Sequence, residues 1–510
     1  MSALASDARS LPAPAPDIDL PDGRIFIGGE WRAGRGAEIR SIYPADRALN
    51  RVLRGASRAD VEEAIAQARK AAADPAWRRL LPHQRAVFLH RIADGISREQ
   101  ERIAQVQSRD TGKTLAETRA LAASAAGTFR YFAAVLETEE EALTPSRGAY
   151  LTLSVHEPIG VVAGITPWNS PIASDAQKLA PALAAGNAVL MKPASWSPLV
   201  SLVLARIVQE AGLPQGLLSV LPGRGDEVGD LLVTHEAIGK VSFTGGTEVG
   251  RGIARKAAEK LMPVSLELGG KSPVIVFADA DLEIAVAGVM FGIFSSTGQS
   301  CIAGLRLLVE RKIYDAFLSL LLRRTAELRI GHPLDPSTQV APLIRDPHRD
   351  AVAKAVDAAR AAGGEVLCGG KPPEGAAYQA GIYYAPTIIA GVPRDADAWR
   401  EEIFGPVLCV APFDDEDEAI ALANDQNYGL ACGIFTRDFN RAWRAGRTVG
   451  AGTVWVNTYK QFSISTPFGG VKDSGLGREK GRQGLRAWSV QKSFYLDTSE
   501  APHPWAGRSA

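Results

Sequence analysis

Three short segments contain residue types that can do chemistry. Cys301 lies among small residues in GQSCIAG, where a thiolate could act as a nucleophile, although most buried cysteines are only small apolar side chains. Glu267 lies in LELGGK, where apolar neighbours would raise its carboxyl pKa and suit a general base, although a glutamate is more commonly exposed at the surface. Asn169 ends the segment TPWN, and its amide could donate to a developing oxyanion or belong to an ordinary turn.

Loops that could hold a phosphate need a specific arrangement of glycines. The two GK[ST] tripeptides, at 112–114 and 270–272, lack the glycine that a P-loop places five residues earlier, since Gln107 and Ser265 stand there. The dinucleotide pattern GxGxxG is also missing. The segment 243–250, FTGGTEVG, does follow an apolar run and open a helical one, so it predicts either a pyrophosphate site at a helix N-terminus or a tight turn.

Alternating strand and helix patterns surround these segments. Short apolar strands followed by helical periodicity predict a parallel α/β sheet, whose ligand-binding loops lie at the carboxyl ends of the strands. In the first region we expect strands at 159–165, 187–192, 217–223 and 240–246 and helices at 59–74, 84–109, 197–212 and 226–235. In the second we expect strands at 273–277, 305–310, 408–413 and 452–457 and helices at 281–296, 313–328, 348–362 and 416–424. Segments 148–157 and 489–497 alternate as exposed strands that pair outside these regions.

Composition excludes several classes of protein. The 510 residues include 57 Lys and Arg against 57 Asp and Glu, so the balanced charge argues against a nucleic-acid or membrane-surface partner. A hydrophobic content of 46% is ample for large cores. Four cysteines without metal or disulfide spacing favour a reducing compartment and predict a cytoplasmic protein, and the seven histidines form no metal-binding cluster.

Taken together, the motifs resemble the aldehyde dehydrogenase superfamily over nearly the whole chain. The resemblance covers DTGK (110–113), TPWN, LELGGK, GQSC, EEIFGP (401–406), PFGG (467–470) and SGLGRE (474–479), in the same order and spacing. It implies an α/β fold with a Rossmann-like parallel-sheet cofactor domain, an α/β catalytic domain and a small bridging β-sheet for oligomerisation. It also implies NAD or NADP as cofactor, an aldehyde as substrate, and a homodimer or homotetramer.

On this resemblance the chain divides into five parts. We expect a flexible arm at 1–22, a dinucleotide-binding domain at 23–144 and 158–268, and a catalytic domain at 269–485. Bridging segments at 145–157 and 486–500 would form the oligomerisation sheet, followed by a tail at 501–510.

The resemblance also implies a role for each matched residue. Cys301 would attack the aldehyde carbon, Asn169 would stabilise the oxyanion, and Glu267 would activate the water that hydrolyses the thioester. Glu479 resembles the family's proton-exit carboxylate, with a salt bridge to a nearby Arg or Lys as the alternative. The implied cofactor-binding residues are Ile165, Thr166, Pro167, Trp168, Asn169, Lys192, Ser195, Gly225, Phe243, Thr244, Gly245, Gly246, Thr247, Val249, Gly250, Leu268, Glu402 and Phe404.

Ser195 departs from the pattern of NAD-preferring relatives, many of which have glutamate there. A glutamate would bind the ribose hydroxyls and repel a 2′-phosphate, whereas serine removes that repulsion and Lys192 could pair with the phosphate. The sequence therefore predicts that NADP is accepted.

The residues expected along the substrate tunnel after Asn169 are smaller or more polar than those of relatives that take simple alkyl aldehydes. The expected substrate residues are Ser170, Ser174, Gln177, Ser300, Ile302, Lys460, Phe462 and Phe468. If Lys460 lines the tunnel rather than the surface, it favours a semialdehyde that bears a carboxylate, and an aromatic or cyclic aldehyde is an equal alternative. A non-catalytic member of the fold would be expected to lose Cys301 or Glu267, and Glu267 argues against a coenzyme A- or acyl-phosphate-linked reductase.

Overall fold

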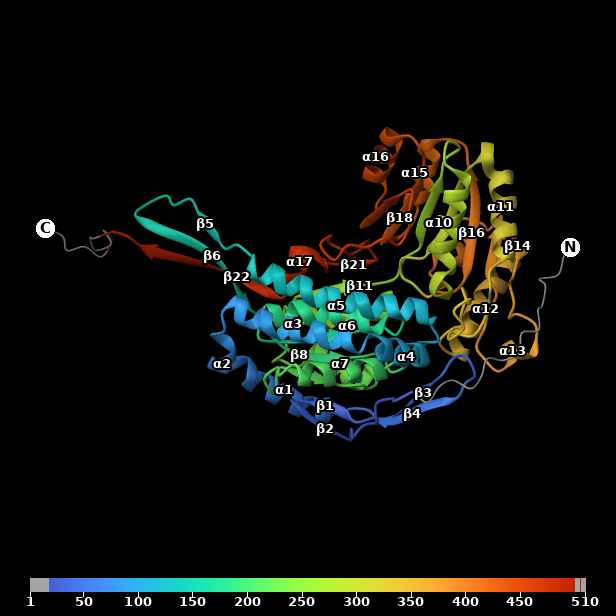
Figure 1. Ribbon diagram of the computed structural model, residues 1–510. Helices are drawn as coiled ribbons and strands as arrows, with labels where there is room; N and C mark the ends of the chain where they lie inside the picture. The colour runs from blue at the N-terminus through green and yellow to red at the C-terminus, as the bar shows by residue number, and fades with distance from the viewer. Residues whose placement is uncertain (1–17, 500–504, 506–510) are drawn as a thin grey trace.

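Two large sheets and one small projecting sheet organise the chain (Figure 1). The structure is a computed structural model that describes residues 18–499 and residue 505. Residues 1–17 of the predicted arm and most of the predicted tail at 501–510 lie outside the described residues.

The first large sheet is mainly parallel and has eight strands in the order β2-β1-β9-β8-β7-β10-β11-β21. Its five central strands, β9 to β11 in that order, run parallel, and the antiparallel pairs lie at its ends. The strands are β1 (Ile25–Ile27), β2 (Glu30–Arg32), β7 (Val161–Ile165), β8 (Ala188–Lys192), β9 (Leu218–Val220), β10 (Lys240–Thr244), β11 (Val264–Glu267) and β21 (Gly475–Leu476).

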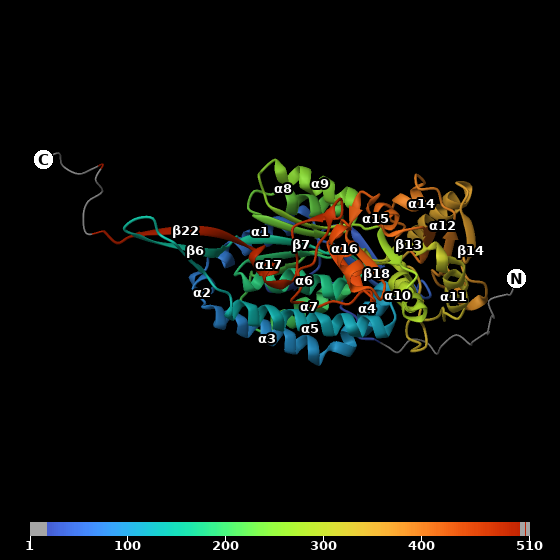
Figure 2. The same ribbon diagram turned by 90° about the horizontal axis from the view of Figure 1, so that it is seen from above.

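Helices cover both faces of this sheet, as Figure 2 shows. Adjacent strand residues point to opposite faces, so Val189 packs into one core and Leu190 into the other. One face carries α3 (Pro82–Arg98), α4 (Gln100–Thr111), α5 (Leu115–Glu137), α6 (Pro171–Ala184) and α7 (Leu199–Glu210). The other carries α1 (Arg58–Ala73), α2 (Pro75–Arg78), α8 (Asp230–Thr234) and α9 (Thr247–Ala258).

The second large sheet has seven strands in the order β14-β15-β16-β13-β12-β18-β19, and only β14 runs antiparallel. Its strands are β12 (Ser272–Val276), β13 (Gly304–Glu310), β14 (Glu365–Cys368), β15 (Thr387–Ala390), β16 (Val407–Phe413), β18 (Ala431–Phe435) and β19 (Thr453–Val456). One face packs on α10 (Leu282–Phe294) and α11 (Tyr314–Ala326). The other packs on α12 (Asp346–Ala361), α14 (Asp397–Arg400), α15 (Glu416–Asn424) and α16 (Phe439–Thr448).

A three-stranded antiparallel sheet projects from the body in both views (Figures 1 and 2). It consists of β5 (Ala142–Thr144), β6 (Tyr150–Pro158) and β22 (Ser489–Asp497). Short elements complete the fold: the strand pairs β3 (Glu38–Ile42) with β4 (Leu49–Arg54) and β17 (Tyr428–Gly429) with β20 (Val471–Lys472), and the helices α13 (Ala376–Gln379) and α17 (Gly481–Arg486).

The predicted elements are found, with four differences of detail. The helix expected at 226–235 is divided into a π-helical turn, Gly225–Gly229, and the short helix α8. The helix expected at 84–109 is divided at Glu99 into α3 and α4, because Glu99 has non-helical backbone angles. Strand β5 pairs with β6, although the predicted boundary at 144 assigns it to the cofactor domain. Strand β21 pairs with β11, although it falls within the predicted catalytic domain. No helix of the described residues is long and apolar enough to cross a membrane.

Candidate active site

The carboxyl ends of β7 to β11 open into one cavity of about 610 Å³. The motifs predicted from the sequence meet there because parallel strands end at the same edge of a sheet. Seventeen of the predicted residues line the cavity: Ile165, Thr166, Pro167, Trp168, Asn169, Lys192, Gly225, Phe243, Thr244, Gly245, Gly246, Val249, Glu267, Leu268, Cys301, Glu402 and Phe404. Its remaining lining residues, which the sequence did not single out, are Ala194, Asp226, Gly229, Asp230, Ile253 and Gly269.

The N-terminus of α9 faces this cavity and fits a pyrophosphate. Gly246 is the N-cap residue and offers no side chain, so the N–H groups of the first turn keep their hydrogen-bonding capacity. A β-carbon at Gly246 would meet nothing within 4 Å, which leaves open space in front of the helix. Of the predicted cofactor residues outside the lining, Thr247 accepts a hydrogen bond from Gly269 N, and Gly250 packs under Leu268. This geometry accommodates the dinucleotide that the sequence predicts.

Lys192 lines the cavity, whereas Ser195, three residues further along the chain, is not among the lining residues. The Ser195 hydroxyl donates to Gly223 O at 2.8 Å, so it adds no charge to its surroundings. Among the described residues, the Lys192 ammonium bonds only to the neighbouring Pro193 carbonyl, at 3.3 Å, and burial lowers the pKa of Lys192 to about 8. An ammonium held in this way has capacity for another acceptor.

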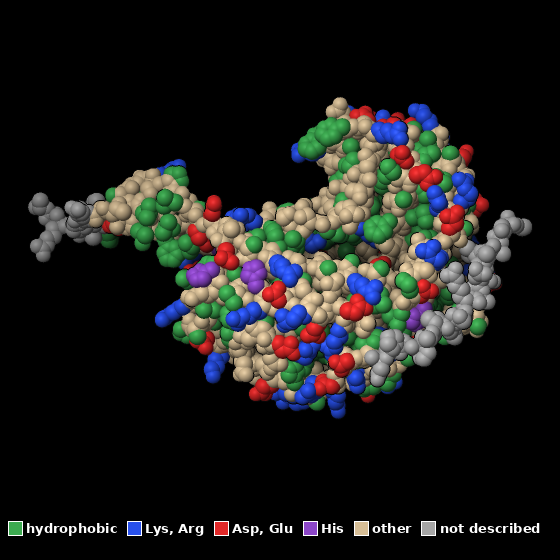
Figure 3. Space-filling model, in the orientation of Figure 1, with side chains coloured by type: hydrophobic (Ala, Val, Ile, Leu, Met, Phe, Trp, Pro, Cys, Tyr) green, Lys and Arg blue, Asp and Glu red, His purple; other side chains and the backbone are tan. Residues whose placement is uncertain are grey.

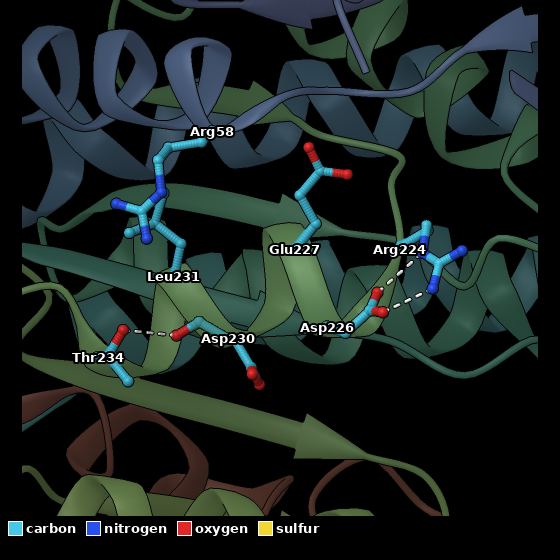
Figure 4. A pocket seen from close by; sticks show the side chains of 7 residues that line it. All are labelled: Arg58, Arg224, Asp226, Glu227, Asp230, Leu231 and Thr234. Atoms are coloured by element: carbon cyan, nitrogen blue, oxygen red, sulfur yellow. Dashed lines mark hydrogen bonds and ion pairs between the residues drawn. The ribbon is translucent and has the colours of Figure 1, made fainter. Parts of the chain in front are cut away.

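A second, polar cleft of about 550 Å³ adjoins the cavity and shares Asp226 and Asp230 with it (Figure 4). Arg224 donates two hydrogen bonds to Asp226, at 2.9 and 2.6 Å, so its guanidinium is already neutralised. Glu227 and Asp230 add two more carboxylates to the lining. The cleft therefore has more acidic than basic groups, and no sequence motif predicted it.

The loop that carries Cys301 is held by hydrogen bonds and by unusual backbone angles. Ser296 and Thr297 have φ of 57° and 55°, which only a tightly constrained segment imposes on residues other than glycine. The Gln299 side chain accepts from Ile344 N at 2.9 Å. Asn169 Nδ2 donates to the Gln299 carbonyl at 3.0 Å, which brings the predicted oxyanion donor to the cysteine loop and leaves its second hydrogen available.

The Cys301 thiol is strongly shielded from water. Burial, Glu402 and Glu267 raise its pKa to about 12, while Lys460 and the Cys301 backbone N–H act in the opposite direction. The cysteine is therefore protonated in this state and needs a base or a nearby positive charge before it can act as a nucleophile.

Glu267 is the residue best suited to remove a proton. It ends β11, its side chain is buried, and neither carboxyl oxygen has a hydrogen-bond partner among the described residues. Burial raises its pKa well above the ordinary value, and the nearby Glu479 carboxylate adds to the effect. A carboxyl group whose pKa is raised in this way is suited to act as a general base.

Glu402 and Phe404 complete the wall of the cavity opposite β7. Glu402 Oε1 accepts from Gly270 N at 3.1 Å, and burial raises the pKa of this carboxyl to about 8. The Phe404 ring meets Trp168 edge to face, with 5.3 Å between their centroids, and His348 holds the Phe404 carbonyl at 2.8 Å.

Glu479 lies below Glu267 in a buried polar network rather than in the cavity. Its Oε1 accepts from Lys178 Nζ at 2.5 Å and from Ser242 Oγ at 2.9 Å, which is the salt-bridge alternative considered for this residue. Its Oε2 accepts from Gln177 Nε2 at 2.6 Å. The Gln177 amide, expected to face the substrate, is thus bonded to Glu479.

None of the other predicted substrate residues is among those that line the cavity. Ser170 and Ser174 bond to each other at 3.2 Å, Ser300 is half-buried, and Ile302 is buried beside the cysteine. The Phe462 and Phe468 rings meet edge to face with 5.4 Å between their centroids. Lys460 Nζ donates to Ser295 Oγ at 2.9 Å, and burial with the nearby Lys113 lowers the Lys460 pKa to about 7. Lys460 is thus partly buried near Cys301 rather than free at the surface.

One residue of this region was missed by sequence reasoning. The Lys480 ammonium lies 4.0 Å from the centroid of Phe462 and 5.1 Å from that of Phe468. Its charge also acts on Glu267 and Cys301. Its place next to Glu479 at the end of the SGLGRE motif was the available signal, but nothing in the sequence showed which rings it would meet.

A half-buried thiol, an amide donor, a carboxyl without a partner among the described residues and a cavity that accommodates a dinucleotide are typical of a cysteine-dependent oxidoreductase. The aldehyde dehydrogenase family model matches residues 31–494, so the chain belongs to the aldehyde dehydrogenase family. Its activity is the NAD-dependent oxidation of an aldehyde.

Individual relatives agree with this assignment. The chain is 43% identical to betaine aldehyde dehydrogenase of Mesorhizobium japonicum over 488 residues, which cover 95% of this chain and 99% of that protein. It is similar to the crystal structure of betaine aldehyde dehydrogenase from Staphylococcus aureus in complex with NAD+, with a TM-score of 0.93, 36% identity, and 96% and 97% of the two chains covered. A putative aldehyde dehydrogenase from Burkholderia cenocepacia gives a TM-score of 0.92 at 38% identity, with 94% and 99% covered.

Close packing at Gly270 generates a prediction about the cysteine loop. A β-carbon at Gly270 would lie 2.5 Å from the Cys301 carbonyl oxygen, so Gly270→Ala must displace the loop. We expect kcat to fall about 100-fold while the protein stays folded, because a misplacement of about 1 Å costs that much in a positioned reaction. Steady-state kinetics measure it. Gly252→Ala is the matched control, since a β-carbon at that helical glycine meets nothing within 4 Å; equal activity of both variants would contradict the prediction.

Proposed function

We propose that the chain oxidises its aldehyde to a free carboxylic acid through a hydrolysed cysteine thioester. The observation that carries this proposal is the buried, unpaired carboxyl of Glu267 in the same cavity as Cys301. A base in that position has water as its natural partner, whereas transfer to an external thiol or phosphate needs no such group.

The steps follow from the positions of the side chains. The Cys301 thiol first loses its proton to solvent hydroxide, and the resulting thiolate attacks the carbonyl carbon, while the Asn169 amide donates to the alkoxide oxygen that forms. NAD or NADP, when bound, supplies the acceptor for the hydride that leaves this carbon. Collapse of the alkoxide leaves an acyl group on the Cys301 sulfur. Glu267 then takes a proton from water, the hydroxide attacks the acyl carbon, and the carbon–sulfur bond breaks to release the acid and regenerate the thiolate.

Two substitutions separate these steps. Cys301→Ala should abolish the pre-steady-state burst of reduced cofactor, because no covalent adduct can form. Glu267→Gln should keep the burst and slow turnover by about 10²–10⁴-fold, the usual contribution of a general base.

Because the raised pKa values of Cys301 and Glu267 keep both groups protonated at low pH, wild-type kcat should rise with pH, and Glu267→Gln should lose the Glu267 part of that rise. Stopped-flow absorbance and product analysis measure these effects; a thioester product or an unaltered turnover in Glu267→Gln would refute the hydrolytic route.

The cavity further supports the use of NADP beside NAD. Ser195 leaves the ribose end without a carboxylate at that position, and the Lys192 ammonium retains capacity for a phosphate oxygen. Asp226 and Asp230 lie in the same part of the lining and moderate this preference. We therefore propose that the protein uses NADP in addition to NAD, and not in place of it.

Restoring a carboxylate at position 195 tests this proposal. Ser195→Glu should lower kcat/KM for NADP at least tenfold through repulsion of the 2′-phosphate and leave that for NAD within about threefold. Ser195→Ala removes the bond to Gly223 without adding charge and serves as the control. Titrations of both cofactors measure the ratio, and a wild-type protein that NAD saturates but that shows no activity with millimolar NADP would contradict the proposal.

The substrate class is proposed from the lysine beside the cysteine. Lys460 is partly buried, and its charge acts on Cys301, so it favours an aldehyde with a carboxylate at its remote end. The relatives are named for betaine aldehyde, whose trimethylammonium group has the opposite charge. An aromatic or cyclic aldehyde is the second candidate, favoured by the half-exposed ring of Phe462.

Removing the Lys460 charge should affect acidic substrates selectively. We expect Lys460→Ala to raise KM for succinic semialdehyde about tenfold and to change KM for butanal little, because only the first substrate has a group that the ammonium can bind. Lys312→Ala is the control, since Lys312 pairs with Glu310 at the surface. An unchanged KM for the semialdehyde would remove the basis for this substrate class.

We also propose a cytoplasmic homodimer or homotetramer. The projecting sheet of β5, β6 and β22 has hydrophobic side chains on the face that Figure 3 shows. Leu143, Tyr495 and Leu496 of this sheet are 65%, 70% and 47% accessible. Apolar side chains on a projecting edge are typical of an interface between subunits. All four cysteines are free thiols, which is consistent with a reducing compartment. Light scattering tests the assembly, and a monomeric mass would contradict it.

A further inference from the structure

Two aromatic rings near Cys301 are already covered by a cation of the chain itself. The Phe462 and Phe468 rings meet at 82°, and the Lys480 ammonium lies within cation–π distance of both. A corner of aromatic faces is the kind of site that attracts a quaternary ammonium group from a ligand. Here the positive charge that these faces favour comes from Lys480.

The backbone holds Lys480 against these rings. Phe468 and Glu479 exchange two hydrogen bonds of 2.7 Å between their N–H and carbonyl groups, which places the next residue beside the Phe468 ring. Lys480 itself has φ of 60° and begins α17, where its carbonyl accepts from Gly484 N at 2.8 Å. A lysine with a positive φ needs such support from its surroundings. The fold therefore holds the Lys480 backbone in this conformation and the side chain against the rings.

The Lys480 charge has no direct partner of opposite sign. Among the described residues, no carboxylate lies within ion-pair distance of its ammonium, and no acceptor bonds to it. Glu479, the adjacent carboxylate, is bonded to Lys178, Ser242 and Gln177 instead. A partly buried ammonium without an acceptor retains its capacity to bind an anion.

Lys460 adds a second cation on the approach to the same sulfur. It lies two residues before Phe462 in the chain, and both lysines act electrostatically on Cys301. Lys113 is also close enough to Lys460 to disfavour its charge. An incoming aldehyde with a positive group therefore meets lysines and rings that are already occupied, whereas one with a carboxylate meets the Lys480 ammonium, which has no acceptor among the described residues, and Lys460, which donates to Ser295.

We propose that Lys480 is a specificity-determining residue that occupies the Phe462–Phe468 corner, excludes quaternary ammonium aldehydes and binds the carboxylate of an anionic aldehyde. This inference rests on the proposed function, since it concerns the substrate of the same site. The Lys460 proposal explains only why an anionic aldehyde is attracted. The Lys480 proposal also explains why a cationic aldehyde is excluded, since the ammonium occupies the aromatic rings that such a substrate would need.

The test compares three aldehyde probes on the full-length protein with saturating NAD. Relative to butanal, Lys480→Gln should raise kcat/KM for betaine aldehyde at least about tenfold and lower it for succinic semialdehyde at least about fivefold. Lys480→Arg, which keeps the charge, should retain the wild-type order of substrates. Lys371→Gln is the control for a surface lysine, since Lys371 pairs with Glu374 and is 67% exposed. If Lys480→Gln leaves the ratio of the two charged substrates unchanged, the inference is wrong.

A second measurement uses the wild-type protein and so does not depend on a variant that folds. Butyrate should inhibit butanal oxidation competitively at lower concentration than choline, which has a trimethylammonium group but no aldehyde. Stronger inhibition by choline would overturn the inference. Butanal oxidation itself reports the proposed function, so loss of that activity in the wild type is distinguishable from a failure of the charge discrimination.

Discussion

A carboxyl group buried without a hydrogen-bond partner is the constraint on which the rest of the site depends. Each such polar atom costs roughly 1–3 kcal/mol relative to a bonded one, and Glu267 has two of them. The cost is acceptable only because β11 is held between β10 and β21 and the two apolar cores support the sheet from both faces. The same burial that makes Glu267 costly keeps it basic enough to activate water.

The base and the nucleophile belong to different sheets, and a very short connection joins them. Glu267 ends β11 of the first sheet, and β12 of the second begins at Ser272. The polar groups of this connection are bonded: Leu268 N donates to Ser474 O, Ser474 Oγ donates to Gly269 O, and Gly270 N donates to Glu402. Since Gly270 also lies against the Cys301 carbonyl, the connection fixes base, nucleophile and Glu402 relative to one another. Catalysis in this fold therefore depends on how rigidly two domains are joined, and less on either domain alone.

Strong local patterns allowed much of this arrangement to be predicted from the sequence. The buried strands β7, β8 and β10 are short apolar runs followed by glycine, proline or threonine, so their carboxyl ends and the cavity they form were predictable. The motifs around Cys301, Glu267 and Asn169 gave the chemistry. Side-chain direction was not predictable in the same way. Gln177 was expected at the substrate, but it lies within reach of Glu479, some three hundred residues away in sequence, and bonds to it. Strand β21 was not predicted, because a strand of two residues is too short to show an alternating pattern. Its pairing also depends on β11, which is distant in the sequence.

Lys480 illustrates why a shared family does not settle a substrate. The motifs that position Cys301, Glu267 and the dinucleotide occupy the interior, where packing and hydrogen bonding tolerate few alternatives. The residues that would contact the end of the aldehyde away from its carbonyl group lie next to those motifs in the sequence. A single charge among them can change which substrate is preferred without altering the reaction at Cys301. The Lys480 ammonium over the Phe462 and Phe468 rings can act in two ways at once. It supplies a positive charge, and it covers the ring faces that would otherwise attract a positively charged substrate. If Lys480 has the proposed role, this chain and a relative that is 43% identical and named for betaine aldehyde share a fold and a reaction but select aldehydes of opposite charge.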